Sequence, residues 1–415
     1  MNLTRFVLNP GFWIFSFCLS SYLLTMGGHL YSADNEIKGL IAESIIERHS
    51  VALPELRMVY MNPGRDGLSY SNFPLGSSLT MIPFYMIGDL TADWFPQIPR
   101  SIVLEFFFST INSIMTAASC TVFFLICLQL KYSIRTATAT ALIYGFSTIA
   151  WPYAKTTWSE PQATLCVLAA FYFILRFREH NGLKWLVLSG TCLGYGITTK
   201  HEMGLYTFLL SGLLLLYLWQ ADRKYHRMFM AGLACGIPLA LFGLLNLYYN
   251  FLRFEDWFAF GHYQTVQQQM EQTAPFFDSM EGFIVGIYQH LFSTGKGILI
   301  YSPPMLMFYW AIKKFKGSHP VEAWFCLAAP VVFFIAAGTS WQMTFMAWGE
   351  RYFVSLTPFL ILPLAALLED LIEQGSAYMK RSMITLVAIG VCIQILGVSV
   401  NFQATSDKLL TKDDV

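Results

Sequence analysis

The sequence predicts an all-α polytopic membrane protein with about eleven transmembrane helices, and three observations support this fold class. Of its 415 residues, 55% are hydrophobic and 13% are charged, which is too apolar for a soluble domain. Apolar runs long enough, or nearly long enough, to cross roughly 30 Å of hydrocarbon recur along the whole chain. Lysine and arginine collect in every second connection between these runs, as expected when basic loops stay inside the cell.

The eleven apolar runs set the expected boundaries of the spans. They cover residues 11–31, 102–130, 137–153, 162–177, 185–199, 204–221, 228–249, 298–312, 321–338, 354–370 and 383–401. A cleavable signal peptide is an alternative for the first run. We expect an uncleaved helix, because the run is longer than the apolar region of most signal peptides and a cut after Ala33 would leave bulky Tyr31 at the third position before it.

The distribution of charge orients these spans. With the N-terminus in the cytoplasm, five inside loops are basic, and they carry Lys131 and Arg135; Arg176, Arg178 and Lys184; Arg223, Lys224 and Arg227; Lys313, Lys314 and Lys316; and Lys380 and Arg381. This pattern predicts an integral, multi-pass protein of the inner membrane with a cytoplasmic N-terminus. The formal net charge is zero, so nucleic acid is not indicated as a partner.

One apolar segment, residues 74–88, does not fit as a span. It is short, it contains Pro83, and counting it would reverse the side of every later loop. We therefore expect an interfacial or re-entrant helix within a first outer loop of residues 32–101. The other outer loops are expected at residues 153–161, 200–203, 250–297 and 340–353. No separate soluble domain is indicated, and residues 1–415 are predicted to form a single transmembrane domain.

The segment after the first span begins with acidic residues. From Asp34 onward, Ile37, Leu40, Ile41 and Ile45 recur with the spacing of one helix face, which predicts an amphipathic helix lying in the membrane interface. Carboxylates at this depth suggest a chemical role. The structural alternative is that Asp34 is only an N-cap and that Glu36 interacts favourably with the helix dipole.

Other ionisable groups lie in the remaining outer loops. Lys155 and Glu160 occupy a very short loop, where they can serve a ligand, pair with each other or reach to lipid head groups. Arg351 stands among aromatic residues, and its guanidinium suits a lipid phosphate, although it can also be an interfacial anchor. Lys296 lies between Gly295 and Gly297, which allow a close approach of the backbone to a ligand.

Several other classes of site find little support. The eight cysteines (Cys18, Cys120, Cys127, Cys166, Cys192, Cys235, Cys326 and Cys392) fall in apolar runs without the close pairs of metal sites or disulfide frameworks. Motifs of zinc hydrolases, serine hydrolases and nucleotide-binding folds are absent in a suitable context. His262 and His290 are isolated and are expected to be loop or core histidines.

These features resemble the GT-C membrane glycosyltransferases, in particular bacterial relatives of protein O-mannosyltransferases and of the 4-amino-arabinose lipid A transferases (glycosyltransferase family 39-like). The likeness rests on the order of five segments along the chain. They are Asp34-Asn35-Glu36 after the first helix, the Pro-Leu-Gly segment of residues 73–78, Trp151-Pro152-Tyr153 leading to Ser159-Glu160-Pro161, Gly295-Lys296-Gly297 with Tyr301-Ser302-Pro303, and Gly349-Glu350-Arg351-Tyr352. Two departures are that Asn35 separates the acids and that Glu160 stands where many relatives carry aspartate.

The resemblance implies an inverting transfer of a hexosyl or pentosyl group from a polyprenyl-phosphate-linked donor to a hydroxyl of a lipid, glycan or protein on the outer, periplasmic face. Asp34 would be the general base. The full set of candidate residues comprises Asp34, Glu36 and Glu160 for catalysis, Arg351, Lys296 and Lys155 for the donor phosphate, and Tyr31, His29, Tyr153 and His262 for the acceptor or sugar.

Three further expectations accompany this set. Trp257, Phe258, Phe260 and Tyr263 could stack on sugar rings or be buried in the interface. No cofactor is required, and a divalent metal is left open. The alternative functions are a polytopic transporter or lipid flippase, and a non-catalytic membrane scaffold, although the ionisable groups collect at one face rather than at the mid-bilayer position typical of transporters.

Overall fold

The structure, a computed structural model, describes residues 9–30, 32–53, 61–221, 225–260, 280–338, 347–373 and 375–402. Helices dominate these residues, with one short pair of strands. In chain order the elements are α2 (Pro10–Thr25), α3 (Ala33–Arg48), β1 (Met61–Pro63), η1 (Arg65–Gly67), β2 (Ser69–Ser71), α4 (Gly76–Ala92), α5 (Arg100–Gln129), α6 (Ile134–Phe146), α7 (Ala150–Lys155), α8 (Glu160–His180), α9 (Leu183–Thr199), α10 (Met203–Gln220), α11 (Tyr225–Phe254), α13 (Met280–Phe292), α14 (Ile298–Tyr301), η2 (Pro303–Met307), α15 (Phe308–Ser318), α16 (Pro320–Gly338), η3 (Arg351–Phe353), α17 (Thr357–Ile361), α18 (Leu364–Glu373) and α19 (Ala377–Ser399).

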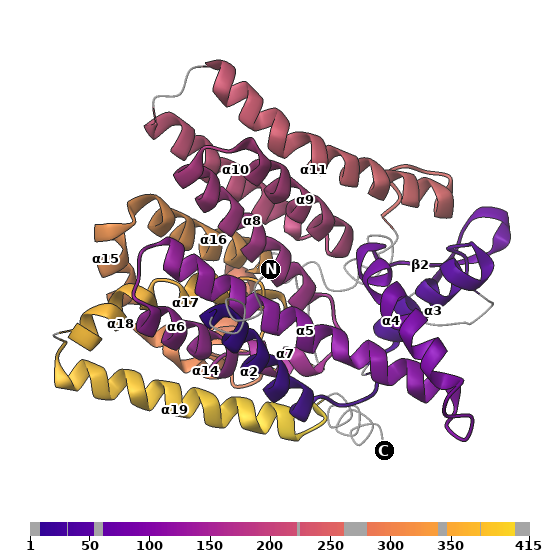
Figure 1. Cartoon of the computed structure of the whole chain (residues 1–415), viewed down its shortest axis with the longest axis horizontal. Helices are drawn as coiled ribbons and strands as arrows, with labels where there is room; N and C mark the ends of the chain where they lie inside the picture. Colours follow the sequence, from indigo (N-terminus) through magenta and orange to yellow (C-terminus); the bar gives the residue numbers. More distant parts are fainter. Residues whose placement is uncertain are drawn as a thin grey trace.

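The long helix α5 runs through the middle of the molecule, with α11 and α19 on opposite sides of it (Figure 1). Helices α2 and α8 pack against α5, α9 packs against α8, and α11 packs against α9. The largest buried cluster draws on α2, α5, α6, α8 and α16 to α18. Within it the ring of Phe171 contacts those of Phe325 and Phe359, with centroids 5.3 and 5.5 Å apart. The core therefore joins the two halves of the chain.

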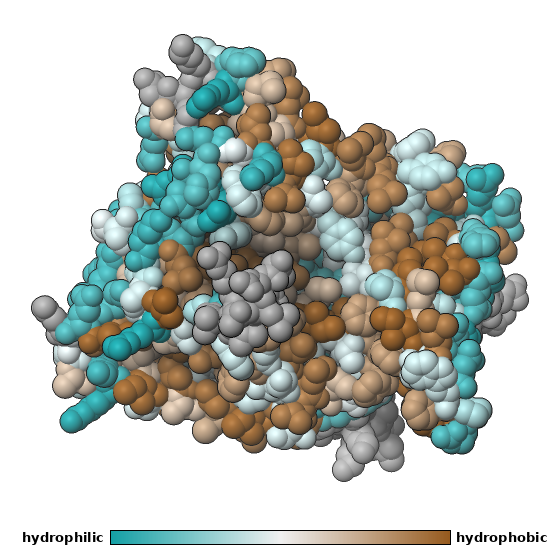
Figure 2. All heavy atoms as spheres, in the orientation of Figure 1, coloured by the Kyte–Doolittle hydropathy of each residue, from teal (hydrophilic) through white to brown (hydrophobic). Residues whose placement is uncertain are grey.

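The surface is that of a membrane protein. In α11, Phe229, Ile237 and Leu241 are each more than half exposed, and only 6% of the most apolar window of this helix is buried. A soluble protein does not expose an apolar stripe of this length. Hydrophilic residues gather along the left and right sides of the view, with brown, hydrophobic residues over much of the surface between them (Figure 2). This arrangement fits a bilayer that surrounds the central part of the molecule.

The predicted number of spans is only partly supported. Among the described residues, four helices are long and apolar enough to cross a membrane: α5, α10, α11 and α19. Shorter apolar helices occur at Pro10–Thr25, Gly282–Phe292 and Pro320–Ala336. Eleven spans remains a prediction.

Three of the predicted spans are not single helices. The run 137–153 is divided between α6 and α7, the run 298–312 among α14, η2 and α15, and the run 354–370 between α17 and α18. Proline explains the last two divisions, because Pro303 and Pro304 begin η2 and Pro363 separates α17 from α18. Proline lacks the backbone donor that a helix interior needs. Apolar length alone could not reveal these breaks.

The predicted first outer loop contains structure that the sequence did not indicate. It contains helices α3 and α4, as expected, but also an antiparallel pair of strands, in which Met61 lies opposite Ser71 and Pro63 opposite Ser69. The prediction of an all-α fold is therefore wrong for this hairpin, whose strands are only three residues long. Residues 74–88 form most of α4, which packs on α3 and α5.

The start of α3 differs from the structural alternative considered for Asp34. Ser32 is the N-cap, the helix begins at Ala33, and Asp34 lies within the first turn. Asp34 is therefore not the cap. Ile37 and Ile41 are buried, as the amphipathic pattern predicts, and Lys38 is buried as well. The buried face of α3 is thus wider than its apolar residues indicate.

The predicted outer loop of residues 250–297 contains a further helix, α13. Its apolar residues, from Gly282 to Phe292, form a segment too short to be taken as a span. Helix α13 packs against α16 and α14, and it brings His290 into the interior, where this residue is 7% exposed. This helix becomes important for the candidate site.

Candidate active site

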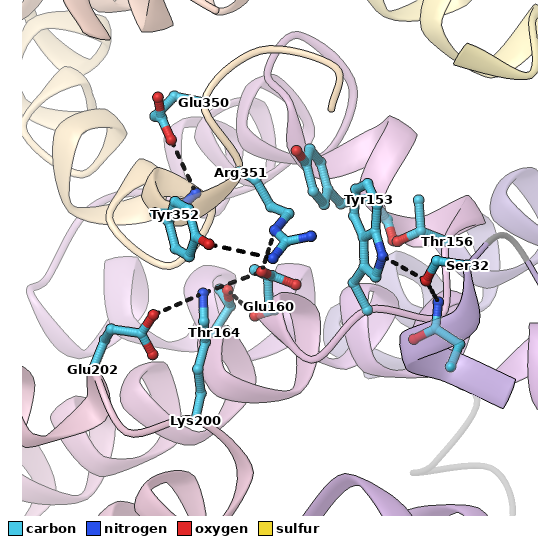
Figure 3. A network of polar contacts seen from close by, with 12 residues as sticks. Ser32, Tyr153, Thr156, Glu160, Thr164, Lys200, Glu202, Glu350, Arg351 and Tyr352 are labelled. Atoms are coloured by element: carbon cyan, nitrogen blue, oxygen red, sulfur yellow. Dashed lines mark hydrogen bonds and ion pairs between the residues drawn. The ribbon is translucent and has the colours of Figure 1, made fainter. Parts of the chain in front are cut away.

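Four segments far apart in the sequence meet at one end of the helix bundle. They are the start of α3, the connection from α7 into α8, the connection from α9 to α10, and the turn η3 (Figure 3). All four lie in, or at the edge of, loops that the sequence predicts on the outer face. Each contributes at least one charged or aromatic side chain to a shared polar network.

Glu160 is the centre of this network. It is the first residue of α8 and is 3% exposed. Its Oε1 atom lies 3.1 Å from the Nζ atom of Lys200 and 3.1 Å from the Nε atom of Arg351 (Figure 3). Its other oxygen, Oε2, is buried without a hydrogen-bond partner. One carboxylate oxygen therefore holds two cations, and the second oxygen has no hydrogen-bond partner among the described residues.

The two cations determine the charge state of Glu160. Burial by itself raises the pKa of this carboxyl, but the charges of Lys200, Arg351 and Lys38 outweigh burial, so its pKa lies below the usual value. In the same way, burial lowers the pKa of Lys200, and the carboxylates of Glu160 and Glu202 more than compensate, so its pKa is raised. The charged forms of Glu160 and Lys200 are therefore favoured.

Aromatic rings hold Arg351 in place. The guanidinium carbon lies 4.8 Å from the ring centroid of Trp158 and 5.2 Å from that of Tyr352, and an Nη2 donor lies 3.4 Å from the Tyr352 hydroxyl. Such cation–π contacts stabilise a desolvated cation by about 2 kcal/mol. Arg351 Nε faces Glu160 as an ion pair rather than as an aligned hydrogen bond. The fork of the guanidinium is therefore oriented but not saturated.

Trp158 connects this cluster to the start of α3. Its indole Nε1 donates to Ser32 Oγ at 3.1 Å, and Asn35 Nδ2 donates to the same oxygen at 2.9 Å (Figure 3). Tyr153 packs on Trp158 with ring centroids 5.6 Å apart, and its buried hydroxyl has no hydrogen-bond partner. Trp158 therefore contacts both the start of α3 and Arg351, and it joins the acidic segment to the basic cluster.

Asp34 and Lys38 lie one helical turn apart on α3, near the start of the helix, which Trp158 contacts. Although burial lowers the pKa of Arg351, the neighbouring Tyr352, Glu160 and Asp34 raise it above the usual value, so Asp34 acts electrostatically on the guanidinium. Lys38 is 4% exposed, and its ammonium lies 5.1 Å from the ring centroid of Phe73. Burial lowers the pKa of Lys38, and the charge of Asp34 opposes this effect.

The structure therefore brings together four of the candidate residues: Asp34, Glu160, Arg351 and Tyr153. It also adds Lys200 and Lys38, which the sequence reasoning missed. Lys200 was placed in an outer loop, and that position next to Glu202 was the available signal. Nothing in the sequence distinguished Lys38 from the charged face of α3.

Other candidate residues lie elsewhere. Lys155 does not pair with Glu160 in this arrangement; its ammonium donates to the carbonyls of Val398 and Val400 at 2.8 and 3.1 Å, at the end of α19. Glu36 is exposed, whereas its neighbour Asn35 is buried. His29 lies just before α3, with Nδ1 2.8 Å from the Gly27 carbonyl. The roles proposed for these three residues stay predictions.

Lys296, a candidate for the donor phosphate, lies in the connection between α13 and α14. Burial lowers its pKa, and the charge of Glu350 opposes this effect. The aromatic residues Trp257, Phe258 and Phe260 follow α11, where Trp257 stacks on Phe251 with centroids 4.9 Å apart. Tyr31, His262 and Tyr263 lie outside the described residues.

A resident metal centre has no visible set of ligands in the described parts of the chain. No three histidine, cysteine, aspartate or glutamate side chains gather there in a way that could hold an ion. The free Oε2 atom of Glu160 is a single potential ligand. Metal dependence therefore stays open.

Comparison with known proteins agrees with the resemblance stated from the sequence. Residues 91–245 match the family described as dolichyl-phosphate-mannose-protein mannosyltransferase. The structure also superposes on ArnT from Cupriavidus metallidurans bound to undecaprenyl phosphate, with a TM-score of 0.56, 12% sequence identity, and coverage of 95% of this chain and 76% of ArnT. The chain has the fold of the GT-C glycosyltransferases.

A second GT-C relative is larger than this chain. The oligosaccharyltransferase of Archaeoglobus fulgidus superposes with a TM-score of 0.57 and 10% identity, over 95% of this chain but only 56% of the oligosaccharyltransferase. This chain therefore spans little more than half of the length of that enzyme. No curated protein matches the sequence. The two superpositions show the GT-C fold. At identities this low they do not show the activity, which has to be inferred from the residues of the site.

Proposed function

We propose that the chain is an inverting glycosyltransferase that moves a sugar from a polyprenyl-phosphate donor to an acceptor hydroxyl on the outer face of the inner membrane. The observation that carries this proposal is the pair of cations, Lys200 and Arg351, held on one oxygen of buried Glu160 beside Asp34. A transferase of this kind needs both a carboxylate that takes the proton of the acceptor hydroxyl and cations that bind the phosphate of the donor. The GT-C fold supports the same assignment.

The proposed reaction assigns one task to each group. The acceptor oxygen forms a bond to the anomeric carbon, while the bond from that carbon to the phosphate oxygen breaks and its electron pair leaves with the lipid phosphate. Asp34 takes the proton of the acceptor hydroxyl as general base. Attack from the side opposite the leaving group inverts the anomeric centre.

The cations would stabilise the departing phosphate, which gains negative charge in the transition state. Arg351 can present its unsaturated fork to two phosphate oxygens, and Lys200 and Lys38 add positive charge in a buried setting where electrostatic stabilisation is strong. Glu160 would then hold Arg351 and Lys200 in place before the donor binds. Its free Oε2 atom can accept a hydrogen bond from a sugar hydroxyl.

The nature of the lipid is supported by analogy with two structures. ArnT was solved with undecaprenyl phosphate, and the A. fulgidus oligosaccharyltransferase with an inhibitory peptide and a dolichol phosphate. A polyprenyl phosphate is therefore the donor carrier we propose here, and the acceptor is a lipid, glycan or protein hydroxyl. The sugar, hexose or pentose, is left to the assay.

The decisive experiment replaces Asp34 by asparagine. Asp34→Asn keeps the shape of the side chain but removes the base, so we expect the turnover of radiolabelled undecaprenyl-phosphate mannose or 4-amino-arabinose to fall by about 100-fold to 10,000-fold. The matched control is Asp66→Asn, because Asp66 lies on the same outer loop and is exposed. Unchanged turnover in Asp34→Asn would refute the proposed base. Translocation of intact donor by the wild-type protein in proteoliposomes would favour the flippase alternative.

A further inference from the structure

A buried acid and a buried histidine meet directly behind Arg351. Glu350 is fully buried, and its Oε2 atom lies 2.5 Å from Nδ1 of His290, which comes from α13, 60 residues earlier in the chain. Glu350 is also the N-cap of η3, where its Oε1 atom accepts the backbone N–H of Tyr352 at 3.4 Å. One carboxylate thus fixes the turn with one oxygen and is itself fixed by His290 through the other.

Packing makes this arrangement rigid. The His290 ring lies against the ring of Phe353 with centroids 5.3 Å apart, and Phe353 packs on Phe334 of α16 at 4.7 Å. On the other side, Gly349 has a φ of +69°, and a Cβ atom there would come within 2.9 Å of the Tyr301 ring. The turn therefore has little room to move, and the direction of the Arg351 side chain depends on it.

Two charged groups face this pair from the neighbouring elements. Lys296, from the connection between α13 and α14, feels the charge of Glu350, and Arg351 follows Glu350 in the chain. A buried carboxylate that loses its partner is costly, since removal of one member of such a pair leaves the other desolvated and unsatisfied. If His290 is removed, the Glu350 carboxylate must form a new hydrogen bond or ion pair. We expect the turn η3, which Glu350 caps, to shift with it.

We infer that His290 is a positioning residue for Arg351. The ring holds Glu350, Glu350 caps the turn η3, and the turn directs the guanidinium toward Glu160 and the space beside Asp34. This inference rests on the proposed function in one respect, namely that Arg351 binds the phosphate of the donor. It assigns α13, a helix within a predicted loop, to the maintenance of that site.

The test compares two substitutions of His290. His290→Asn keeps a donor near the position of Nδ1, and His290→Leu removes it. We expect His290→Leu to weaken binding of undecaprenyl phosphate about tenfold and to speed amide hydrogen exchange across residues 347–356, and we expect His290→Asn to restore both toward the wild-type values. Adding Glu350→Gln to His290→Leu should cause little further loss. His319→Leu is the control, because His319 bonds to the Leu130 carbonyl in another part of the fold.

The outcomes separate this inference from the proposed function. Unchanged exchange across residues 347–356 in His290→Leu would overturn the positioning role, and so would equal losses in His290→Asn and His290→Leu. Arg351→Gln, measured for undecaprenyl phosphate binding in parallel, tests the proposed phosphate site. If Arg351→Gln binds normally, the phosphate assignment fails, while the exchange measurement still decides whether His290 holds the turn.

Discussion

At the scale of single residues, the sharing of one Glu160 oxygen between Lys200 and Arg351 explains how the site can be both stable and receptive. Two buried cations without a counter-charge would repel each other and pay a large desolvation cost. Glu160 offsets this cost with one oxygen only. The donor phosphate can therefore add negative charge to the same cations without first displacing a saturated ion pair.

The charge of Glu160 should make stability depend on pH in a defined direction. Its pKa is lower in the folded protein than the ordinary 4.5, so its contribution is present above about pH 4.5 and is lost as the pH falls through the lower, folded-state pKa. We expect Glu160→Gln to lower the free energy of unfolding by about 3 kcal/mol at pH 7. Chemical denaturation in detergent between pH 3.5 and 7 measures this difference.

The pH dependence is the part of this prediction that a packing effect would not produce. The gap between wild type and Glu160→Gln should narrow as the pH falls below 4.5. Glu202→Gln is a suitable control, because Glu202 lies 3.5 Å from Lys200 but is 44% exposed, and a substitution there should cost no more than about 1 kcal/mol. A gap that stays constant with pH would contradict the charged role of Glu160.

Residue types could be predicted from the sequence better than residue partners. Glu160 is a candidate because an ionisable group in a very short loop needs a partner, and Arg351 because its guanidinium suits a lipid phosphate; both lie in the network. Their common partner, Lys200, could not be identified, because it comes from a connection that only the fold brings near. For the same reason Lys155 was assigned to the phosphate, although its ammonium meets the carbonyls of Val398 and Val400.

At the scale of helices, small residues decide how closely α9 approaches α11. A Cβ atom on Gly190 would come within 2.0 Å of the Cys235 carbonyl oxygen, and one on Gly194 within 2.8 Å of Phe242. Backbones that approach this closely gain dispersion contacts that replace the missing hydrophobic driving force in lipid. The glycines therefore fix α9, whose C-cap is Lys200, against the exposed helix α11.

A single methyl group should disturb this contact. We expect Gly190→Ala to destabilise the protein by about 1 to 3 kcal/mol, because the backbone of α11 has to move. Gly212→Ala is the matched control within α10: no heavy atom lies within 4 Å of a Cβ there, so this change should be neutral or slightly stabilising. Thermal unfolding of both variants in the same detergent makes the comparison. Equal melting temperatures would argue against the close contact.

The boundaries of the elements show why apolar length was an incomplete guide. The runs at 102–130, 204–221 and 383–401 are helices, since nothing interrupts their periodicity. The runs at 298–312 and 354–370 contain prolines that break them, and α13 was overlooked because its apolar segment is short. The hairpin β1/β2 has strands of three residues, and such strands carry too little pattern to be recognised.

At the scale of the whole molecule, the contacts between loops sort into two groups. One joins loops with many basic residues: Arg178 pairs with Glu322, Lys131 with Glu179, and Lys314 with Asp370. The other contains the candidate site. Figure 1 shows α15 and α18 at the left of the molecule and α3 and α4 at the right, so the ends of the first group lie apart from the predicted first outer loop.

Labelling should assign these two ends to the two sides of the membrane. We expect a membrane-impermeant maleimide to label Arg65→Cys in spheroplasts, because η1 lies in the loop of residues 32–101 that the sequence predicts on the outer face. Lys316→Cys, at the end of α15, should react only after permeabilisation. The wild-type protein corrects for its native cysteines. Reversed labelling would place the site in the cytoplasm and would contradict the positive-inside assignment.

The buried Arg253 joins the end of the exposed helix α11 to the predicted first outer loop. Its guanidinium donates to the carbonyls of Ser71 and Phe73 and to Asn250 Oδ1, so the last turn of α11 is fastened beneath the hairpin. The thirty residues of α11 measure about 45 Å, more than an average hydrocarbon thickness of about 30 Å, so the polar ends of the helix extend into the head groups or the helix tilts. The thickness of the surrounding lipid therefore bears on the tilt of a helix whose last turn is held by Ser71 and Phe73 of the predicted first outer loop.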